Sequence, residues 1–309
     1  MTESQAIFNF LTAAGWNAAH HHPLCADFST RRFTRLAHPD GRTAIFMQAA
    51  ADQKTPQFVA VANLLRQADL SAPEIYAAAP ASGLVLMEDF GDTTFGTLLD
   101  QGHENLPLYS RAAEALAHIH KTFRPADALA LPHFSTALFT EQVELFLDHY
   151  RPPAPDTERA AFREAWHTTL APLESLPQTL LLRDFMPDNV MDLPNRKGWR
   201  NVGLLDFQDS GLGPLAYDLA SLCESVRREG GIETLDAVLT HYLKHNPVMP
   251  LPDLRRACRI LAAQRHMRIL GLLAKRNDKP LYEARVRATI THLAQDEALR
   301  HVRPWMELT

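Results

Sequence analysis

Two short segments of the chain carry residue types that suit chemistry on phosphate groups. In the first, Arg183-Asp184 is followed after four residues by Asn189, and the second is the dipeptide Asp206-Phe207. Mg²⁺ prefers oxygen ligands, and one or two protein groups usually hold it together with phosphate oxygens and water. Asn189 and Asp206 can supply such ligands, and Asp184 can orient an attacking hydroxyl and accept its proton. These residues therefore indicate metal-assisted phosphoryl transfer.

The spacing of these residues matches the R-D-x-x-x-x-N part of the kinase catalytic loop, and Asp206-Phe207 stands where a metal-binding D-F dipeptide belongs. A D-x-x-x-x-N pattern also arises by chance, and the alternative is a turn with Asx hydrogen bonds. The context favours catalysis, because the apolar segments 180–182 and 202–205 each run into one of the aspartates. We expect two strand ends that bring their carboxylates to one edge.

The secondary structure expected around these residues changes along the chain, from mainly strands to mainly helices. Strands are expected at 28–36 and 42–48, joined by a His38-Pro39-Asp40-Gly41 turn, then a helix at 55–68 and strands at 75–77 and 83–87. Beyond the acidic, glycine-containing break 88–92, helices are expected at 109–121, 136–150, 158–173, 219–229, 232–245 and 254–275. This order predicts an α+β fold with a small β-rich N-terminal lobe, residues 1–88, and a larger, mainly helical C-terminal lobe, residues 89–309.

The composition narrows the classes of partner. The 309 residues have a formal charge of −5, without the basic excess of a nucleic-acid binder, so we expect no nucleic-acid partner. No apolar run approaches the roughly 20 residues that span a bilayer, so no membrane partner is expected. The start of the chain lacks a signal-peptide pattern, and the three cysteines are far apart, which predicts a cytoplasmic protein.

Several longer blocks carry a resemblance to a known family. Residues 181–191, 203–209 and 213–222 resemble the aminoglycoside phosphotransferase and choline kinase superfamily. Residues 27–36, 87–92 and 264–271 make the likeness closest to the bacterial anomeric sugar kinases, which phosphorylate N-acetylmuramate and N-acetylglucosamine at C1 in cell-wall recycling. The resemblance implies a two-lobed protein-kinase-like fold, ATP and Mg²⁺ as cofactors, and a small-molecule sugar as substrate.

The resemblance also implies roles for particular residues. Asp184 is expected to be the catalytic base, Asn189 and Asp206 the Mg²⁺ ligands, and Asp218 a buried brace of the catalytic loop. Adenine is expected near the backbone of residues 88–90, with the phosphates under the turn of residues 29–32. The candidate ATP-binding residues are thus Ser29, Thr30, Arg31, Arg32, Glu88 and Phe90.

One departure from the kinase pattern concerns the phosphate clamp. The strand 42–48 has no lysine, the helix 55–68 has no glutamate to pair with one, and Lys54 lies beyond the strand. Arg31 and Arg32 are the candidate replacements, because guanidinium groups bind phosphate in a bidentate manner. Neighbouring strand residues point to opposite faces, so the alternative is that at least one of the two is a surface charge.

The segment Gln264-Arg265-His266 lies in an expected helix on faces that should be buried. Buried charge requires a partner. The partner of Arg265 could be a carboxylate within the helical lobe or an anionic or hydroxyl-rich substrate, such as the lactyl carboxylate of N-acetylmuramate. We take Arg265 and His266 as candidate substrate-binding residues.

Other functions remain open from the sequence. A phosphotransferase for an aminoglycoside or another small alcohol shares the same catalytic residues. A non-catalytic pseudokinase is suggested by the missing lysine and by Leu182, which stands where many relatives have His. His20-His21-His22 could bind a metal, but no second ligand cluster accompanies it. The oligomeric state is left unknown.

Overall fold

The protein is described by a computed structural model that covers residues 2–24, 31–50, 54–124, 131–151, 154–228, 231–276 and 280–308. Contacts divide the chain into two compact units. The first unit comprises residues 1–98 and 188–209, and the second comprises 99–187 and 210–309. The division into an N-terminal lobe 1–88 and a C-terminal lobe 89–309 remains a prediction. In the structure, the segment 188–209 makes its contacts mainly with the N-terminal part of the chain.

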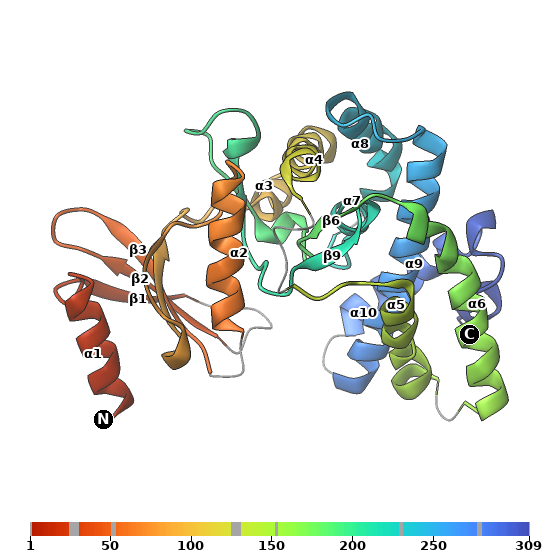
Figure 1. The fold of residues 1–309 in the computed structure, drawn as a ribbon, viewed down its shortest axis with the longest axis horizontal. Coiled ribbons are helices and arrows are strands. Elements are labelled where there is room, and N and C mark those ends of the chain that lie inside the picture. Colours follow the sequence, from red (N-terminus) through yellow and green to blue (C-terminus); the bar gives the residue numbers. More distant parts are fainter. Residues whose placement is uncertain are drawn as a thin grey trace. The chain divides into compact units, whose positions relative to one another are not determined.

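The first unit is built on a five-stranded antiparallel sheet (Figure 1). Its strands, in spatial order, are β1 (His20–Leu24), β2 (Arg32–Ala37), β3 (Thr43–Gln48), β5 (Leu84–Glu88) and β4 (Ile75–Ala79). β2 and β3 form the expected hairpin, whose register pairs Ala37 with Thr43 next to the turn. Gly41 closes this turn with a φ of 90°, and its N–H donates to the carbonyl of His38.

Helices α1 (Glu3–Ala13) and α2 (Thr55–Gln67) lie on opposite sides of this sheet (Figure 1). Side chains alternate between the two faces of a strand. Leu36, Phe46 and Leu86 are therefore on one face, where they form a buried cluster with Leu11 of α1 and with Trp16. This packing gives the small sheet a core that it could not form alone.

The remaining part of the first unit is a short antiparallel pair. β7 (Val190–Asp192) pairs with β8 (Val202–Leu204), and Val190 lies opposite Leu204. Isolated bridges join Met191 to Thr94 and Gly203 to Ser71. The pair thereby attaches to the chain that follows the five-stranded sheet.

The second unit is mainly helical. Three of its long helices are α4 (Asn105–Thr122), α8 (Gly231–His245) and α9 (Leu251–Arg276), with α4 packed along α8 and α8 against α9. The remaining elements are α5 (Thr136–Val143), α6 (Asp156–Leu170), β6 (Gln178–Leu181), β9 (Gly211–Pro214), α7 (Ala216–Cys223), α10 (Pro280–Leu293) and α11 (Arg303–Met306), and α3 (Phe95–Asp100) connects the two units along the chain. The single helix expected at 136–150 is instead α5 followed by a π-helical turn at Phe146–Tyr150.

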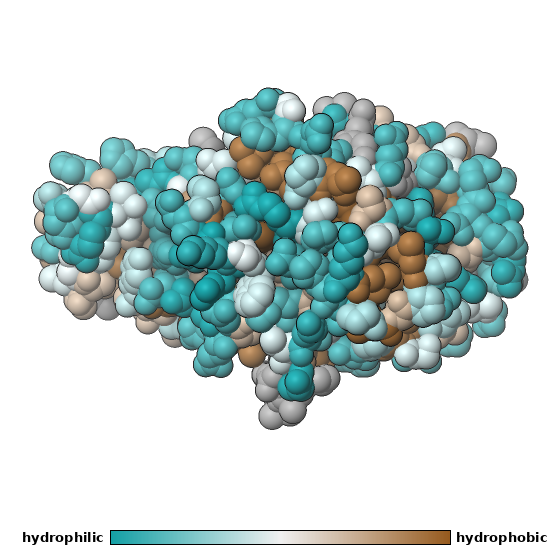
Figure 2. Space-filling model, turned by 90° about the horizontal axis from the view of Figure 1, so that it is seen from above, coloured by the Kyte–Doolittle hydropathy of each residue, from teal (hydrophilic) through white to brown (hydrophobic). Residues whose placement is uncertain are grey.

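These observations confirm the predicted α+β class, with a β-rich part and a larger helical part. Figure 2 shows one face of the molecule, on which hydrophilic residues dominate and hydrophobic areas interrupt them. Within the described ranges, no helix combines the length and the apolar character that crossing a membrane would require.

Candidate active site

The two candidate metal ligands lie beside each other in the first unit. Asn189 immediately precedes β7, and Asp206 follows β8 by two residues. Because β7 and β8 are antiparallel, the start of β7 and the end of β8 lie at the same end of the strand pair. The amide Nδ2 of Asn189 lies 3.4 Å from Oδ2 of Asp206, and the N–H of Leu205 donates to the carbonyl of Asn189 at 3.1 Å.

Neighbouring residues hold Asp206 in an unusual backbone conformation. Its φ is +58°, a region that non-glycine residues rarely occupy and that often marks functional sites. Phe207 is buried and stacks on Phe58 of α2, with ring centroids 5.1 Å apart, so the chain is anchored directly after Asp206. The amide of Gln208 donates to Oδ1 of Asp206 at 2.7 Å. The second carboxylate oxygen and a rotated Asn189 amide supply hard oxygen donors, which fits a Mg²⁺ ion.

A lysine and an arginine face the acidic residues at this edge. The ammonium of Lys54 lies 2.5 Å from Oδ1 of Asp209, so a residue that seemed poorly placed in the sequence reaches the carboxylate next to the candidate metal ligands. Arg31 is 9% exposed, and burial lowers its pKa, while the negative charges of Asp206 and Asp209 act in the opposite direction. Arg31 thus lies within electrostatic range of both aspartates.

Arg32 is placed differently from its neighbour. Its side chain is 69% exposed and pairs with Glu3 of α1 at 2.6 Å. Arg31 precedes β2, which begins at Arg32, and of the two arginines only Arg31 is buried and within electrostatic range of Asp206 and Asp209.

The residues expected near adenine form a second group in the first unit. Glu88 ends β5, and its carboxylate pairs with Arg196 and lies 3.8 Å from Arg66. The guanidinium of Arg196 also lies over the ring of Phe90, 5.1 Å from its centroid. The N–H of Glu88 donates to the carbonyl of Glu74, so this group is already engaged within the protein. Ser29 and Thr30 lie outside the described residues.

The candidate base, Asp184, lies in the second unit directly after β6. The N–H of Asp184 donates to the carbonyl of Leu182 at 2.9 Å, across a γ-turn centred on Arg183. The φ of Arg183 is +74°, which is the value of the rarer and more strained type of γ-turn. The turn therefore requires support from outside its own three residues.

Asp218 of α7 supplies that support. Its Oδ2 accepts from the N–H of Leu182 at 2.6 Å, and its Oδ1 accepts from the N–H of Arg183 at 3.0 Å. The side chain is fully buried, and this burial raises its pKa to about 7, although the two backbone hydrogen bonds and the charge of Arg183 act in the opposite direction. Asp218 fastens the backbone immediately before Asp184.

Aromatic rings hold the side chain of Arg183. Its guanidinium lies 4.0 Å from the ring centroid of Phe134 and 5.1 Å from that of Tyr217. Such stacking suits the planar guanidinium and stabilises it in a mostly apolar surrounding. Arg183 therefore contributes to the position of the turn through packing as well as through its backbone.

Among the described residues, Arg265 of α9 has the largest charged side chain that is fully buried. It is 1% exposed, and neither its Nε nor its Nη1 has a hydrogen-bond partner among the described residues. Burial lowers its pKa, and the negative charge of Asp184 acts against this effect. No carboxylate of the described chain makes an ion pair with it within 4.0 Å, although it also influences the pKa of the buried Glu224. The guanidinium has donors to spare and lies within electrostatic range of Asp184.

His266 is equally buried but has a different environment. Its Nδ1 lies 2.8 Å from the carbonyl oxygen of Ala262, one turn back along α9, and its Nε2 has no partner among the described residues. Burial and the neighbouring Arg265 lower the pKa of His266 to about 3, so the imidazole is neutral at physiological pH. With Nδ1–H donating to the carbonyl, Nε2 is an acceptor for a hydroxyl or an amide.

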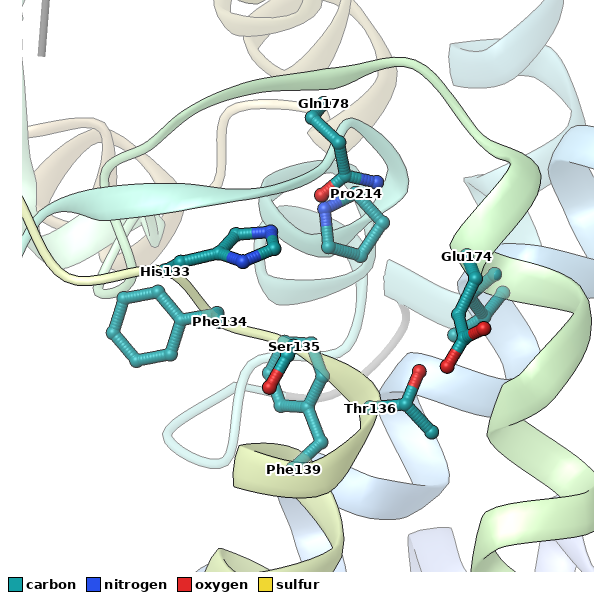
Figure 3. A pocket seen from close by; sticks show the side chains of 9 residues that line it. His133, Phe134, Ser135, Thr136, Phe139, Glu174, Gln178 and Pro214 are labelled. Atoms are coloured by element: carbon teal, nitrogen blue, oxygen red, sulfur yellow. The ribbon is translucent and has the colours of Figure 1, made fainter. Parts of the chain in front are cut away.

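A pocket of about 270 Å³ lies elsewhere in the second unit (Figure 3). Its lining includes His133, Phe134, Phe139, Glu174 and Gln178. Gln178 begins β6, whereas Asp184 follows the end of that strand, and neither Asp184 nor Arg265 lines this pocket. Phe134 connects it to the turn, because the same ring packs against Arg183.

The structure differs from the sequence expectation in the arrangement of two strands. β6 precedes Asp184 and pairs with β9, while β8 precedes Asp206 and pairs with β7. The two strands belong to separate sheets in separate units, so they do not share a single sheet edge. The contacts of Gln208 with Asp206 and of Lys54 with Asp209 are not predicted by the sequence, since both depend on tertiary structure.

Known proteins with similar sequences are kinases. The N-acetylmuramate/N-acetylglucosamine kinase of Caulobacter vibrioides is 30% identical, in an alignment that covers 96% of this chain and 94% of that protein. The protein of the same name from Pseudomonas aeruginosa is also 30% identical, with 87% of this chain and 82% of that protein covered.

Solved structures with the same fold confirm the kinase-like architecture. A choline kinase, LicA from Streptococcus pneumoniae, superposes with a TM-score of 0.69 at 16% identity, over 95% of this chain and 99% of that chain. The GDP complex of aminoglycoside 2'-phosphotransferase-IIIa gives a TM-score of 0.65 at 14% identity, over 98% and 99%. The sequence matches the phosphotransferase enzyme family over residues 22–261, a range that contains Asp184, Asn189 and Asp206. The chain therefore belongs to the phosphotransferase enzyme family.

Proposed function

We propose that the protein is an ATP- and Mg²⁺-dependent kinase that phosphorylates the anomeric hydroxyl of N-acetylmuramate or N-acetylglucosamine. The observation that carries this proposal is the sequence similarity to kinases named for these two sugars, at 26–30% identity over 83–96% of the chain. Peptidoglycan contains both sugars, so the proposed reaction would serve cell-wall recycling, and the proposed use of ATP supports a cytoplasmic location.

In the proposed reaction, Asp184 accepts the proton of the anomeric hydroxyl. The ring oxygen makes this hydroxyl more acidic than that of an ordinary alcohol, which suits a carboxylate base. A bond forms between the sugar oxygen and the γ-phosphorus, the bond from that phosphorus to the bridging oxygen breaks, and ADP leaves. The brace from Asp218 supports this role, because it fixes the backbone that carries the base.

Asn189 and Asp206 would hold Mg²⁺, with Gln208 orienting the carboxylate of Asp206. When bound, the ion neutralises negative charge on the phosphates. Arg31 is the proposed phosphate ligand, supported by its position within range of Asp206 and Asp209. Glu88 and Phe90, with Ser29 and Thr30, stay candidates for the contacts with ATP.

Arg265 and His266 are proposed to recognise the sugar. The guanidinium of Arg265 has two nitrogen atoms without a partner among the described residues, which suits the lactyl carboxylate of N-acetylmuramate. The neutral imidazole of His266 suits a hydroxyl or the acetamido group. A polycationic aminoglycoside is disfavoured beside a buried arginine.

A substrate panel tests the proposal. Release of ADP is measured with ATP, Mg²⁺ and each of N-acetylmuramate, N-acetylglucosamine, glucose, choline and kanamycin. We expect the two N-acetylated sugars to give the highest kcat/KM. A preference for kanamycin or choline would assign another alcohol as the substrate, and no turnover with any acceptor would favour a non-catalytic role.

The recognition role of Arg265 is tested with Arg265→Met, which keeps the length of the side chain and removes its charge. We expect the KM for N-acetylmuramate to rise and that for N-acetylglucosamine to change much less, because only the former carries a carboxylate. The thermal midpoint should stay the same or rise, because an unpaired buried charge is removed. A marked drop in the thermal midpoint with an unchanged ratio of the two KM values would show a structural role instead.

A further inference from the structure

Two helices of the second unit bring together three side chains that can bind a metal. Glu114 lies on α4, and His241 and His245 lie one turn apart on α8, the helix that packs along α4. One ligand atom from each residue lies within 4.8 Å of the other two. Residues spaced i and i+4 project from the same side of a helix, and the two imidazole centroids are 4.9 Å apart.

The chemistry of these three groups favours one class of cation. Two histidines at i and i+4 on a helix form the ligand pair that zinc enzymes use, and a carboxylate is a common third ligand. Mg²⁺ and Ca²⁺ prefer sites made of oxygen atoms, whereas imidazole suits Zn²⁺, Ni²⁺ and Cu²⁺. All three side chains are half-buried, so a cation could reach them from solvent.

A second observation points to a ligand that the protein itself does not provide. Nε2 of His241 is buried and has no hydrogen-bond partner among the described residues. Buried polar atoms usually have a partner, so an added ligand would satisfy this nitrogen. Burial lowers the pKa of His241, as do the neighbouring His245 and Lys244, while Glu114 acts against them. The neutral imidazole is the form that binds metals.

We propose that Glu114, His241 and His245 form a binding site for a divalent cation of the Zn²⁺ class, which cross-links α4 to α8. In a tetrahedral site with bonds of about 2.0–2.1 Å, ligand atoms lie about 3.4 Å apart. The three side chains therefore move together by a change of rotamer when the cation binds, and water takes the fourth position. The site uses none of the residues assigned to phosphoryl transfer, so it acts on the stability of the second unit.

Cobalt(II) is a suitable probe, because it binds at zinc sites and shows visible absorption bands whose intensity rises in four- and five-coordinate geometry. The full chain is prepared without an affinity tag, stripped of metals with a chelator and kept in excess Mg²⁺ so that Mg²⁺ competes at the phosphoryl-transfer site. We expect about one Co²⁺ per chain, with intense bands that Zn²⁺ abolishes. His241→Ala and Glu114→Gln should each weaken Co²⁺ binding roughly tenfold or more.

The control is the triple variant His20→Ser, His21→Ser, His22→Ser, which removes the exposed histidines of β1. It should bind Co²⁺ like the wild type. Loss of binding in this variant, or equal binding by the wild type and His241→Ala, would overturn the proposal, as would an absence of Co²⁺ bands in the wild type.

Thermal unfolding provides a readout that does not depend on spectra. Zn²⁺ should raise the midpoint of the wild type but not that of Glu114→Gln, whose midpoint without metal should equal that of the wild type. If His241→Ala fails to fold, His245→Gln replaces it in both experiments. Equal shifts for the wild type and the Glu114→Gln variant would contradict the assignment of the ligands.

Discussion

Replacement of Asp218 by asparagine tests how the strained turn before Asp184 is held. In the wild type, both oxygens of the Asp218 carboxyl group accept a backbone N–H, from Leu182 at 2.6 Å and from Arg183 at 3.0 Å. Asn keeps one acceptor oxygen and turns an NH₂ group toward the other N–H. One hydrogen bond is then lost and one buried N–H has no acceptor, which costs about 1–3 kcal/mol of unfolding free energy.

The contribution of Asp218 to the free energy of unfolding depends on pH. The pKa of Asp218 is about 7 in the folded protein and about 3.9 in an unfolded chain. Because the folded value is the higher one, the stability that this group contributes is fully present below pH 4 and is lost as the pH rises toward 7. The difference of three pH units corresponds to at most about 4 kcal/mol. Between pH 5 and pH 8, the stability advantage of the wild type over Asp218→Asn should therefore be larger at pH 5 and shrink or reverse by pH 8.

Urea unfolding at pH 5, 6, 7 and 8 measures this difference. Asp236→Asn is the matched control, because Asp236 is an exposed carboxylate that pairs with Arg255 on the surface. The kcat of Asp218→Asn should fall by about 10- to 100-fold, since a small displacement of Asp184 is costly, while the KM for ATP stays the same. A stability difference that is constant or grows from pH 5 to pH 8 would refute the account of the buried carboxylate.

Three further substitutions, and Arg32→Ala as a control for one of them, test the site and the packing around it. Gln208→Ala should raise the Mg²⁺ concentration needed for half-maximal activity by about 10- to 100-fold, because Gln208 orients a carboxylate that we assign to the ion; an unchanged Mg²⁺ titration would count against this. Arg31→Ala should raise the KM for ATP by about tenfold, and Arg32→Ala should leave it unchanged, as Arg32 is a surface residue. Similar KM values for the two variants would contradict the assignment of Arg31 as a phosphate ligand. Gly271→Ala should lower the urea midpoint by an amount equivalent to about 1–3 kcal/mol despite the higher helix propensity of Ala, because the new Cβ would lie 2.3 Å from the carbonyl oxygen of Leu145; an unchanged midpoint would show that this contact relaxes freely.

Much of the fold follows from local sequence signals. The hairpin of β2 and β3 follows from apolar alternation and a Pro-Asp-Gly turn, and α8 follows from its helical periodicity. β1 was missed, because His20-His21-His22-Pro23 has no apolar alternation and becomes a strand only through pairing with β2. The helix expected at 136–150 is interrupted by a π-helical turn that packs against α9, an effect of tertiary contact that periodicity does not record.

The candidate site shows the same division between local and tertiary signals. The proximity of Asn189 and Asp206 follows from the pairing of β7 with β8, of which the sequence indicates the apolar segment before Asp206. The contact of Gln208 with Asp206 and that of Lys54 with Asp209 depend on how the backbone turns after β8, which no sequence period encodes. Strand alternation predicts that the side chains of Arg31 and Arg32 point in opposite directions. It does not predict which of the two lies near Asp206 and Asp209.

The position of the transferred phosphate tests the central proposal most directly. N-acetylglucosamine labelled with carbon-13 at C1 is incubated with the wild-type protein, ATP and Mg²⁺, and the product is examined by carbon and phosphorus NMR. We predict that the C1 signal of the product shows coupling to phosphorus, and that Asp184→Asn forms this product about 10²- to 10⁴-fold more slowly. A phosphate on any other oxygen of the sugar, or an Asp184→Asn variant as fast as the wild type, would contradict the proposed reaction.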